Sequence, residues 1–381
     1  MRREQARRGI PLLVCLLTLV VTSCSEDITG LGDEFDAVAV ARVVTDVGAM
    51  EGQNTAVAHI PIVGDVLRQS IGAGAAVVPR FGREGVFRVS PQRRLGLPGV
   101  ALSQGELEAP PGGVRYSQGQ GATTAILPAS HHGKTFVLTS LDGWTIDDER
   151  SDAPSNGVRF LLYELDPITG RPKLIPPQQM GYMDFVEEAG TSTPRLRVLA
   201  RTSGDDTLLD YYLEGSSVLT EGGAVTAFSS AGSLLAEERV DYSLEDSIIF
   251  SDGFQQADVY FGRDLDIPAE DLAVALVMDG VLRNSEVDPG LIQLTLTISS
   301  GPATAVLNVL DDGFTVDGHL TYNGQTVVLV SGDSFDPTFT NPDGTALTET
   351  EDQAVWEIFT GVDLLLGFGD QMLAPLSLLF P

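Results

Sequence analysis

Three carboxylates near the C-terminal end of the chain could bind a cation. Asp333, Asp336 and Asp343 lie close together in a stretch that also contains Gly, Pro and Asn. An irregular loop could bring these side chains round a calcium ion, which prefers oxygen ligands. The alternative is that they form Asx turns leading into the last helix, with each carboxylate bonded to nearby backbone. The standard calcium loop is matched only in part, because Phe339 and Thr350 stand where two of its ligands are required.

Two adjacent histidines, His131 and His132, are the other candidate metal ligands. Neighbouring side chains in an extended backbone point to opposite faces, so one ion does not easily reach both rings. The chain has four histidines in all, and the other two are His59 and His319. We therefore interpret the pair as structural or exposed, and we expect no metal and no other cofactor.

Two further motifs resemble parts of enzyme or nucleotide sites but are incomplete. Gly133-Lys134-Thr135 resembles the end of a phosphate-binding loop, yet the chain has Pro128 where that loop requires glycine, and a strand pattern follows instead of a helix. Gly332-Asp333-Ser334 resembles the nucleophile block of the GDSL esterases, which use a histidine base further along the chain. No histidine follows His319, and a serine without a positioned base is a weak nucleophile. We therefore predict that the protein is not an enzyme.

The N-terminal residues have the organisation of an export signal. Residues 1–9 carry four arginines and one glutamate, and residues 10–21 are almost wholly apolar. A basic start and an apolar run too short to span a bilayer are typical of a secretory signal peptide. Val21-Thr22-Ser23-Cys24 then resembles the lipobox of bacterial lipoproteins. This resemblance implies that residues 1–23 are removed and that Cys24 is acylated.

The lipoprotein resemblance covers residues 1–25 and predicts where the protein is found. Residues 24–32 would form a polar tether, and acyl chains on Cys24 would attach the protein to the membrane of the cell envelope. Some lipoproteins carry an aspartate directly after the cysteine, and this aspartate retains them in the inner membrane. Here Ser25 stands at that position, so we expect the protein in the outer membrane if the host has one. The alternative is an ordinary secretory signal. Cys15 lies inside the signal, so processing would leave one cysteine and no disulfide.

The net charge limits the possible partners. It is −30 for the whole chain, and the residues of the signal are net positive, so processing makes it more negative still. Nucleic acid is excluded as a partner, because its phosphates require clustered positive charge. Anionic lipid headgroups would also be repelled, which leaves the acyl chains as the contact with the membrane.

The residues after the tether divide into two regions of different character. Residues 33–130 are interpreted as a helical and irregular region rich in Gly and Ala. Within it a helix is predicted over 33–48, with Asp33 as a candidate cap and Gly48 at its end. Its expected apolar face consists of Phe35, Val38, Ala41, Val44 and Val47.

Residues 131–381 are predicted to form an antiparallel β domain. Apolar and polar residues alternate in many short segments, as in 291–299, where Ile292, Leu294, Leu296 and Ile298 would face the core. Asn323-Gly324 is typical of a type I′ hairpin turn. Closely spaced strands with tight turns favour a mainly β protein with an antiparallel meander, in a curved sheet, sandwich or barrel.

A C-terminal helix is predicted over residues 347–366. Thr348 and Glu351 fit a capping box, and an apolar stripe should pack on the sheet. The stripe consists of Ala354, Ile358, Val362 and Leu365. The two tryptophans, Trp144 and Trp356, are expected to fill the core.

The sequence leaves two functions open. The first is a non-enzymatic envelope lipoprotein that acts as a scaffold or docking protein. The second is a carrier that binds an apolar ligand in a curved sheet beneath the terminal helix. A large dry cavity would favour the carrier, and a filled core would favour the scaffold.

Overall fold

The computed structural model describes twelve parts of the chain, which together contain the whole of the predicted β domain's sheet. They are residues 34–71, 126–139, 143–166, 172–173, 178–188, 193–220, 223–236, 238–252, 255–283, 288–334, 336–373 and 375. Cys24, the predicted signal at 1–23 and the tether at 24–32 lie outside the described residues.

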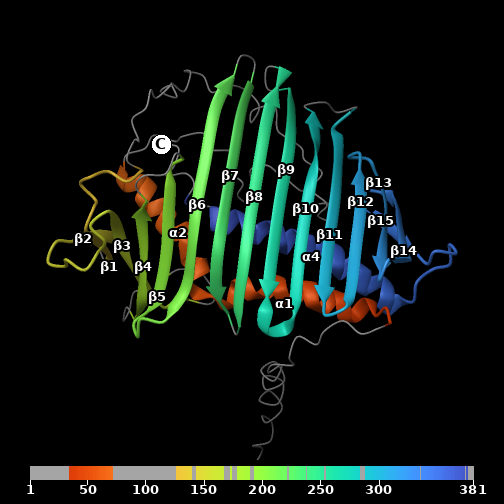
Figure 1. Cartoon of the computed structure of the whole chain (residues 1–381), viewed down its shortest axis with the longest axis horizontal. Coiled ribbons are helices and arrows are strands. Elements are labelled where there is room, and N and C mark those ends of the chain that lie inside the picture. Colours follow the sequence, from red (N-terminus) through yellow and green to blue (C-terminus); the bar gives the residue numbers. More distant parts are fainter. Residues whose placement is uncertain are drawn as a thin grey trace, which may run out of the picture.

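Fifteen strands form one curved, open sheet (Figure 1). The spatial order is β15-β14-β13-β12-β11-β10-β9-β8-β7-β6-β5-β4-β3-β1-β2, so that from β3 onward each strand lies beside its neighbour in the sequence. The pairs are antiparallel except that β1 and β3 are parallel. The prediction of a mainly β protein with an antiparallel meander is confirmed, and of the three forms considered it takes that of a curved sheet.

The strands lengthen toward the middle of the sheet. Their bounds are β1 Lys134–Thr139, β2 Gly143–Asp147, β3 Gly157–Tyr163, β4 Gln179–Glu187, β5 Arg195–Thr202, β6 Thr207–Thr220, β7 Gly223–Leu235, β8 Arg239–Ser251, β9 Gln256–Ile267, β10 Leu272–Arg283, β11 Gly290–Ser300, β12 Ala303–Asp311, β13 Thr315–Tyr322, β14 Gln325–Asp333 and β15 Asp336–Thr340.

Alternation in the sequence sets which face of the sheet is buried. Ile292, Leu294, Leu296 and Ile298 of β11 are buried as predicted, and the residues between them lie on the other face. The Asn323-Gly324 turn between β13 and β14 has φ angles of 50° and 79° at its two residues. Only a primed turn requires positive φ at both positions, so the predicted type I′ turn is confirmed.

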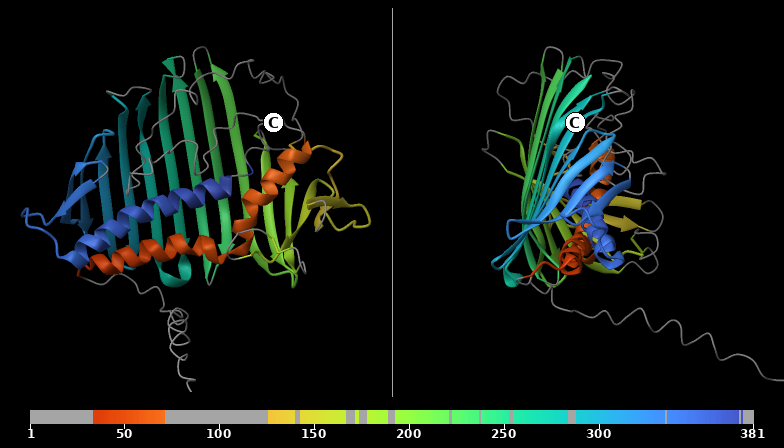
Figure 2. Two further views of the ribbon diagram at one scale, coloured as in Figure 1. Left: turned by 180° about the vertical axis from the view of Figure 1, so that it is seen from behind. Right: turned by 90° about the vertical axis from the view of Figure 1, so that its right-hand side faces the viewer.

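The three α-helices of the described residues lie on one face of the sheet. They are α1 (Ala37–Gln53), α2 (Thr55–Ile71) and α4 (Glu349–Leu373), and a short 3₁₀ turn, η2 (Pro268–Glu270), joins β9 to β10. Figure 2 shows α1 and α4 running side by side across the strands, with α2 continuing over the other end of the sheet. Their apolar side chains pack with those of most strands in one core, and a second, smaller apolar cluster lies over β8–β11. None of the described helices is long and apolar enough to cross a membrane.

Helix α1 begins and ends later than predicted. Asp36, rather than Asp33, caps it, because its Oδ1 accepts hydrogen bonds from the backbone N–H groups of Val38 (2.9 Å) and Ala39 (3.2 Å). The helix continues past Gly48 to Gln53. A glycine costs only about 1 kcal/mol inside a helix, which burial of the apolar face offsets. Val38 was assigned to that face wrongly, since it is 41% exposed.

Asn54 fixes the joint between α1 and α2. Its side-chain Oδ1 accepts hydrogen bonds from the N–H groups of Ala56 (2.9 Å) and Val57 (3.3 Å) and thereby caps α2. Its Nδ2 donates to the carbonyl of Leu208 (2.9 Å), near the start of β6, and to that of Leu235 (2.8 Å), at the end of β7. One buried side chain therefore satisfies four backbone groups and holds the joint against the sheet. The sequence did not predict α2.

Helix α4 has the predicted start but is longer than predicted. The Thr348 hydroxyl and backbone N–H both donate to Glu351, and the Glu351 N–H donates to Thr348, so the capping box is confirmed. The predicted stripe is buried, and the helix continues beyond Leu366 to Leu373 because Phe368 and Met372 extend the same buried face. A methyl group at Gly361 would lie 2.0 Å from Val44, so glycine is required where α4 touches α1.

Candidate functional site

The three carboxylates predicted as a possible cation site do not come together. Asp333 and Asp336 are paired across the turn between β14 and β15, whereas Asp343 lies beyond the other end of β15. Asp343 accepts hydrogen bonds from the Thr345 N–H (2.9 Å) and hydroxyl (2.6 Å), which is an Asx turn. The described residues contain no group of three or more side chains that could hold a metal ion.

The adjacent histidines diverge. His131 is stacked on Phe136, with its Nδ1 3.1 Å from the Ser130 hydroxyl, whereas the His132 Nε2 is 3.7 Å from a carboxylate oxygen of Glu187. Burial lowers the pKa of His131, and the neighbouring His132 lowers it further. The interpretation of the pair as structural is consistent with these contacts.

The two incomplete motifs also have structural partners. After Gly133 the chain enters β1, where Thr135 is buried and donates a hydrogen bond to Asp152 (2.9 Å), and Lys134 forms an exposed ion pair with Asp148 (2.6 Å). Ser334 is buried and donates to Asp311 Oδ1 (2.7 Å). That carboxylate also accepts from the Gly313 N–H, so the serine belongs to a turn network.

One face of the sheet carries none of the described helices, and we call it the bare face (Figure 2, right). Side chains on it alternate with the buried residues along every long strand. Two parts of this face differ in chemistry: an arginine lattice over β3–β6 and an acidic groove over β8–β11.

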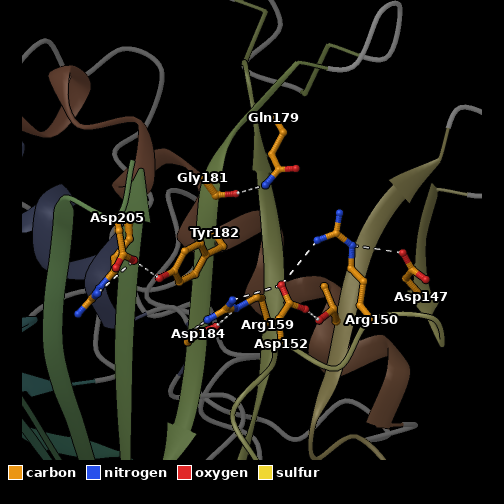
Figure 3. Close-up of polar contacts among 11 residues, drawn as sticks. Asp147, Arg150, Asp152, Arg159, Gln179, Gly181, Tyr182, Asp184 and Asp205 are labelled. Atoms are coloured by element: carbon orange, nitrogen blue, oxygen red, sulfur yellow. Dashed lines mark hydrogen bonds and ion pairs between the residues drawn. The ribbon is translucent and has the colours of Figure 1, made fainter. Parts of the chain in front are cut away.

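The arginine lattice consists of Arg159, Arg195, Arg197 and Arg201 with their carboxylate partners. Arg159 donates to both oxygens of Asp184, at 2.7 and 2.8 Å, and its guanidinium lies 3.8 Å from the centre of the Tyr182 ring (Figure 3). The Tyr182 hydroxyl in turn donates to Asp205 (2.6 Å). Such bidentate and stacked contacts hold planar groups in fixed positions.

The same arrangement repeats on the next two strands. Arg197 donates to both oxygens of Asp210, at 2.8 and 2.6 Å, and Arg195 lies 2.8 Å from Glu214. The guanidinium of Arg195 stacks on Tyr212 at 4.1 Å. Arg201 lies 3.2 Å from Asp205, so each arginine of the lattice has an acidic partner and the charges of these four pairs balance.

Burial and pairing act in opposite directions on Asp184. Burial raises its pKa, and the Arg159 guanidinium opposes that rise without cancelling it. The hydrogen bond to Asp184 raises the pKa of Arg159, which therefore stays charged. For Asp152, burial is outweighed by its hydrogen bond from Thr135 and by the nearby arginines, so its pKa falls below the ordinary value.

The acidic groove has a volume of about 300 Å³. On the bare face it is lined by carboxylates and small side chains, namely Asp241, Ser243, Asp264, Asp266, Ala273, Ala275, Thr297 and Ser299. The Ser243 hydroxyl donates to Asp264 (3.2 Å), and Arg239 donates to Asp241 (2.8 Å). The groove is open to solvent, and its accessible lining is mostly apolar with the three carboxylates among it, so it would admit a cationic group carried on an apolar chain.

A buried ion pair lies on the other face, beneath α4. The side chains of Arg263 and Asp246 are each 1% exposed and are joined by two hydrogen bonds, one of them 3.1 Å long. A methyl group at Gly369 would lie 2.1 Å from Arg263 Nε, so a larger residue here would displace the guanidinium from its place beneath α4. Burial raises the pKa of Asp246, against the effect of Arg263.

Known proteins give no guide to these features: no protein-family model, no curated protein and no solved structure matches the chain. The sequence indicated part of the lattice, because Arg195, Arg197 and Arg201 alternate with buried residues in β5. It did not indicate their partners, which come from neighbouring strands. It missed the groove and the Arg263–Asp246 pair, since both depend on register between strands.

Proposed function

We propose that the protein is a lipid-anchored docking protein of the cell envelope, without enzymatic activity of its own. The observation that carries the proposal is the bare face: the sheet has fifteen strands, and all of the described α-helices lie on one side of it. A face of this kind offers a broad, rigid surface. The anchor part of the proposal rests on the resemblance of residues 21–24 to a lipobox.

The packing beneath the helices favours docking over carriage of a ligand. Side chains from α1, α4 and the strands that they cover are almost fully buried, as at Val44, Ile358 and Leu296. Interiors packed in this way have little room for a large ligand. The ordered pairs of the arginine lattice support docking as well, because they keep polar groups in place before a partner arrives.

One observation favours the carrier as a second candidate. The helix-covered side of the sheet carries a separate apolar cluster over β8–β11, and Leu366 is the helix residue that packs against it among those described. Its buried members are Ile248, Ala257, Val259, Phe261, Met278, Leu282 and Ile292. A carrier would place an apolar ligand there. Native mass spectrometry of the protein purified from its own cells would show a bound apolar molecule in that case.

Photo-crosslinking in intact cells tests the docking proposal. A benzophenone amino acid would replace Tyr212 or Thr295 on the bare face, and Gln353 on the exposed side of α4 as the control. We expect one discrete cross-linked product from a bare-face position and none from Gln353. Cross-links from Gln353 alone, or from none of the positions, would contradict docking through the bare face.

The anchor is tested separately by intact mass. The protein extracted from membranes should lack residues 1–23 and carry added acyl mass at Cys24. If Cys24→Ala is cleaved and retained in the same way as the wild type, the anchor part of the proposal fails.

A further inference from the structure

We propose that the bare face of β8–β11 docks a cationic, amphipathic segment of a partner protein. This inference rests on the proposed docking function and names the partner's chemistry. The surface, which we call the acidic patch, comprises the groove and the strand residues beyond it. Its members are Asp241, Glu245, Ile249, Asp258, Tyr260, Asp264, Asp266, Asp279 and Leu291.

The charges of the acidic patch are not balanced as those of the arginine lattice are. Within the described residues, Arg239 is the one cation that pairs with a carboxylate of the patch, at Asp241. Asp241 stands directly opposite Asp266 in the β8–β9 register. Like charges at opposed positions in a sheet repel one another and destabilise it. A bound cation would reduce the repulsion between these two carboxylates.

An aromatic ring lies among these carboxylates. Tyr260 is 36% exposed and lies across Gly262, where a methyl group would come within 2.9 Å of its hydroxyl and 3.3 Å of its ring. The register neighbours of Gly262 are Glu245 on β8 and Val277 on β10. An accessible aromatic ring beside carboxylates suits an arginine or lysine, which the ring attracts through its π face.

Apolar side chains complete the surface. Ile249 and Leu291 are 42% and 44% exposed at the end of the patch away from the groove. Val281 is opposite Leu291, and Asp258 is opposite both Ile249 and Val281, so this row across four strands places one carboxylate among three apolar groups. A partner that carried only charge would leave the apolar groups in water, whereas an amphipathic cationic segment would cover both.

Other occupants fit less well. Nucleic acid and anionic lipid would be repelled by the carboxylates. A metal ion would find too few ligands, since the described residues contain no group of three side chains that could hold one. A second copy of this face would place carboxylates against carboxylates.

The test uses a synthetic amphipathic peptide of lysine and leucine as the probe, with binding to the full processed protein followed by fluorescence anisotropy. The double variant Asp264→Asn/Asp266→Asn should weaken binding about tenfold and reduce its dependence on salt. The matched control, Asp317→Asn/Asp352→Asn, removes the same charge from exposed positions outside the patch and should change binding less than about twofold. Equal losses in the two variants would overturn the proposal, because binding would then reflect net charge alone.

Two further variants test the contribution of the ring and of the apolar groups. Tyr260→Leu keeps an apolar side chain but loses the π face, and it should weaken binding of a lysine-containing peptide. Leu291→Ser should weaken binding without changing its salt dependence. If neither variant has an effect, the patch does not recognise an amphipathic segment.

Failure of the acidic-patch proposal can be distinguished from failure of the proposed docking function. A cross-link in cells from Tyr212 but not from Thr295, together with equal peptide binding by the patch and control variants, would retain docking through the bare face and remove the acidic patch as its site. Loss of all bare-face cross-links would remove the function itself.

Discussion

The ion pair between Arg263 and Asp246 should destabilise the protein strongly when one partner is removed, but not when both are replaced. Asp246→Asn leaves a guanidinium without its counter-charge at a site where the arginine side chain is 1% exposed. Removing one member of a buried pair typically destabilises a protein by about 3–5 kcal/mol. We therefore expect a loss of that size in the free energy of unfolding.

The double variant Asp246→Leu/Arg263→Met removes both charges and keeps apolar volume beneath α4. Its stability should lie within about 1 kcal/mol of the wild type, or above it, because neither ion then has to be desolvated. Urea unfolding followed by tryptophan fluorescence and by far-UV circular dichroism would give both values. The two single variants and the double variant together form a cycle that isolates the coupling energy.

Both expectations depend on α4 lying over this pair. A cost of less than about 1 kcal/mol for Asp246→Asn would refute them, since the pair would then behave like an exposed one. A double variant as unstable as the single ones would also refute them, because the loss would come from packing and not from an uncompensated charge.

Three further predictions concern the core and its titration. Asn54→Ala should lower the free energy of unfolding by about 1–3 kcal/mol, because it removes a helix cap and the donor to the part-buried carbonyls of Leu208 and Leu235. Asn54→Ser can still cap α2 and should cost less. Ile358→Ala should cost about 2–4 kcal/mol in urea unfolding, and a loss below about 1 kcal/mol would mean that α4 is peripheral. Because burial raises the pKa of Asp184 above its ordinary value of 3.8, the folded state binds that proton more tightly than the unfolded state. The stability of the wild type relative to Asp184→Asn should therefore be highest below the ordinary pKa and fall as the pH rises through the raised one, and a difference that does not vary with pH would contradict this.

Much of the architecture could be predicted because it depends on local pattern. Alternation in β11 identified its buried residues, and the Asn323-Gly324 pair identified a turn whose backbone only such residues adopt readily. The capping box at Thr348 was readable for the same reason. The form of the sheet could not be predicted in this way, since neither alternation nor turn type decides whether a meander closes into a barrel.

The errors arose where tertiary contacts override local preference. Helix α1 continues through Gly48, and α4 continues past Leu366, because both bury apolar faces against the sheet. Ser334 belongs to a motif that suggests a nucleophile, yet its burial against Asp311 gives it a structural partner. The bare face could be foreseen only in part, as at the alternating arginines of β5, because the partners of its side chains come from neighbouring strands in a register that the sequence alone does not specify.

Carboxyl footprinting tests the central claim, that the bare face is a docking surface, most directly. A water-soluble carbodiimide would label Asp and Glu side chains in intact cell envelopes and in the purified protein, and peptide mass spectrometry would compare the two. We predict that Asp258, Asp264 and Asp266 are protected in envelopes, while Glu270 and Glu349, which lie outside the acidic patch, are labelled equally in both. Equal labelling of all five in the two samples would contradict docking through the acidic patch, and equal labelling of Asp210 and Glu214 of the arginine lattice as well would contradict docking through the bare face.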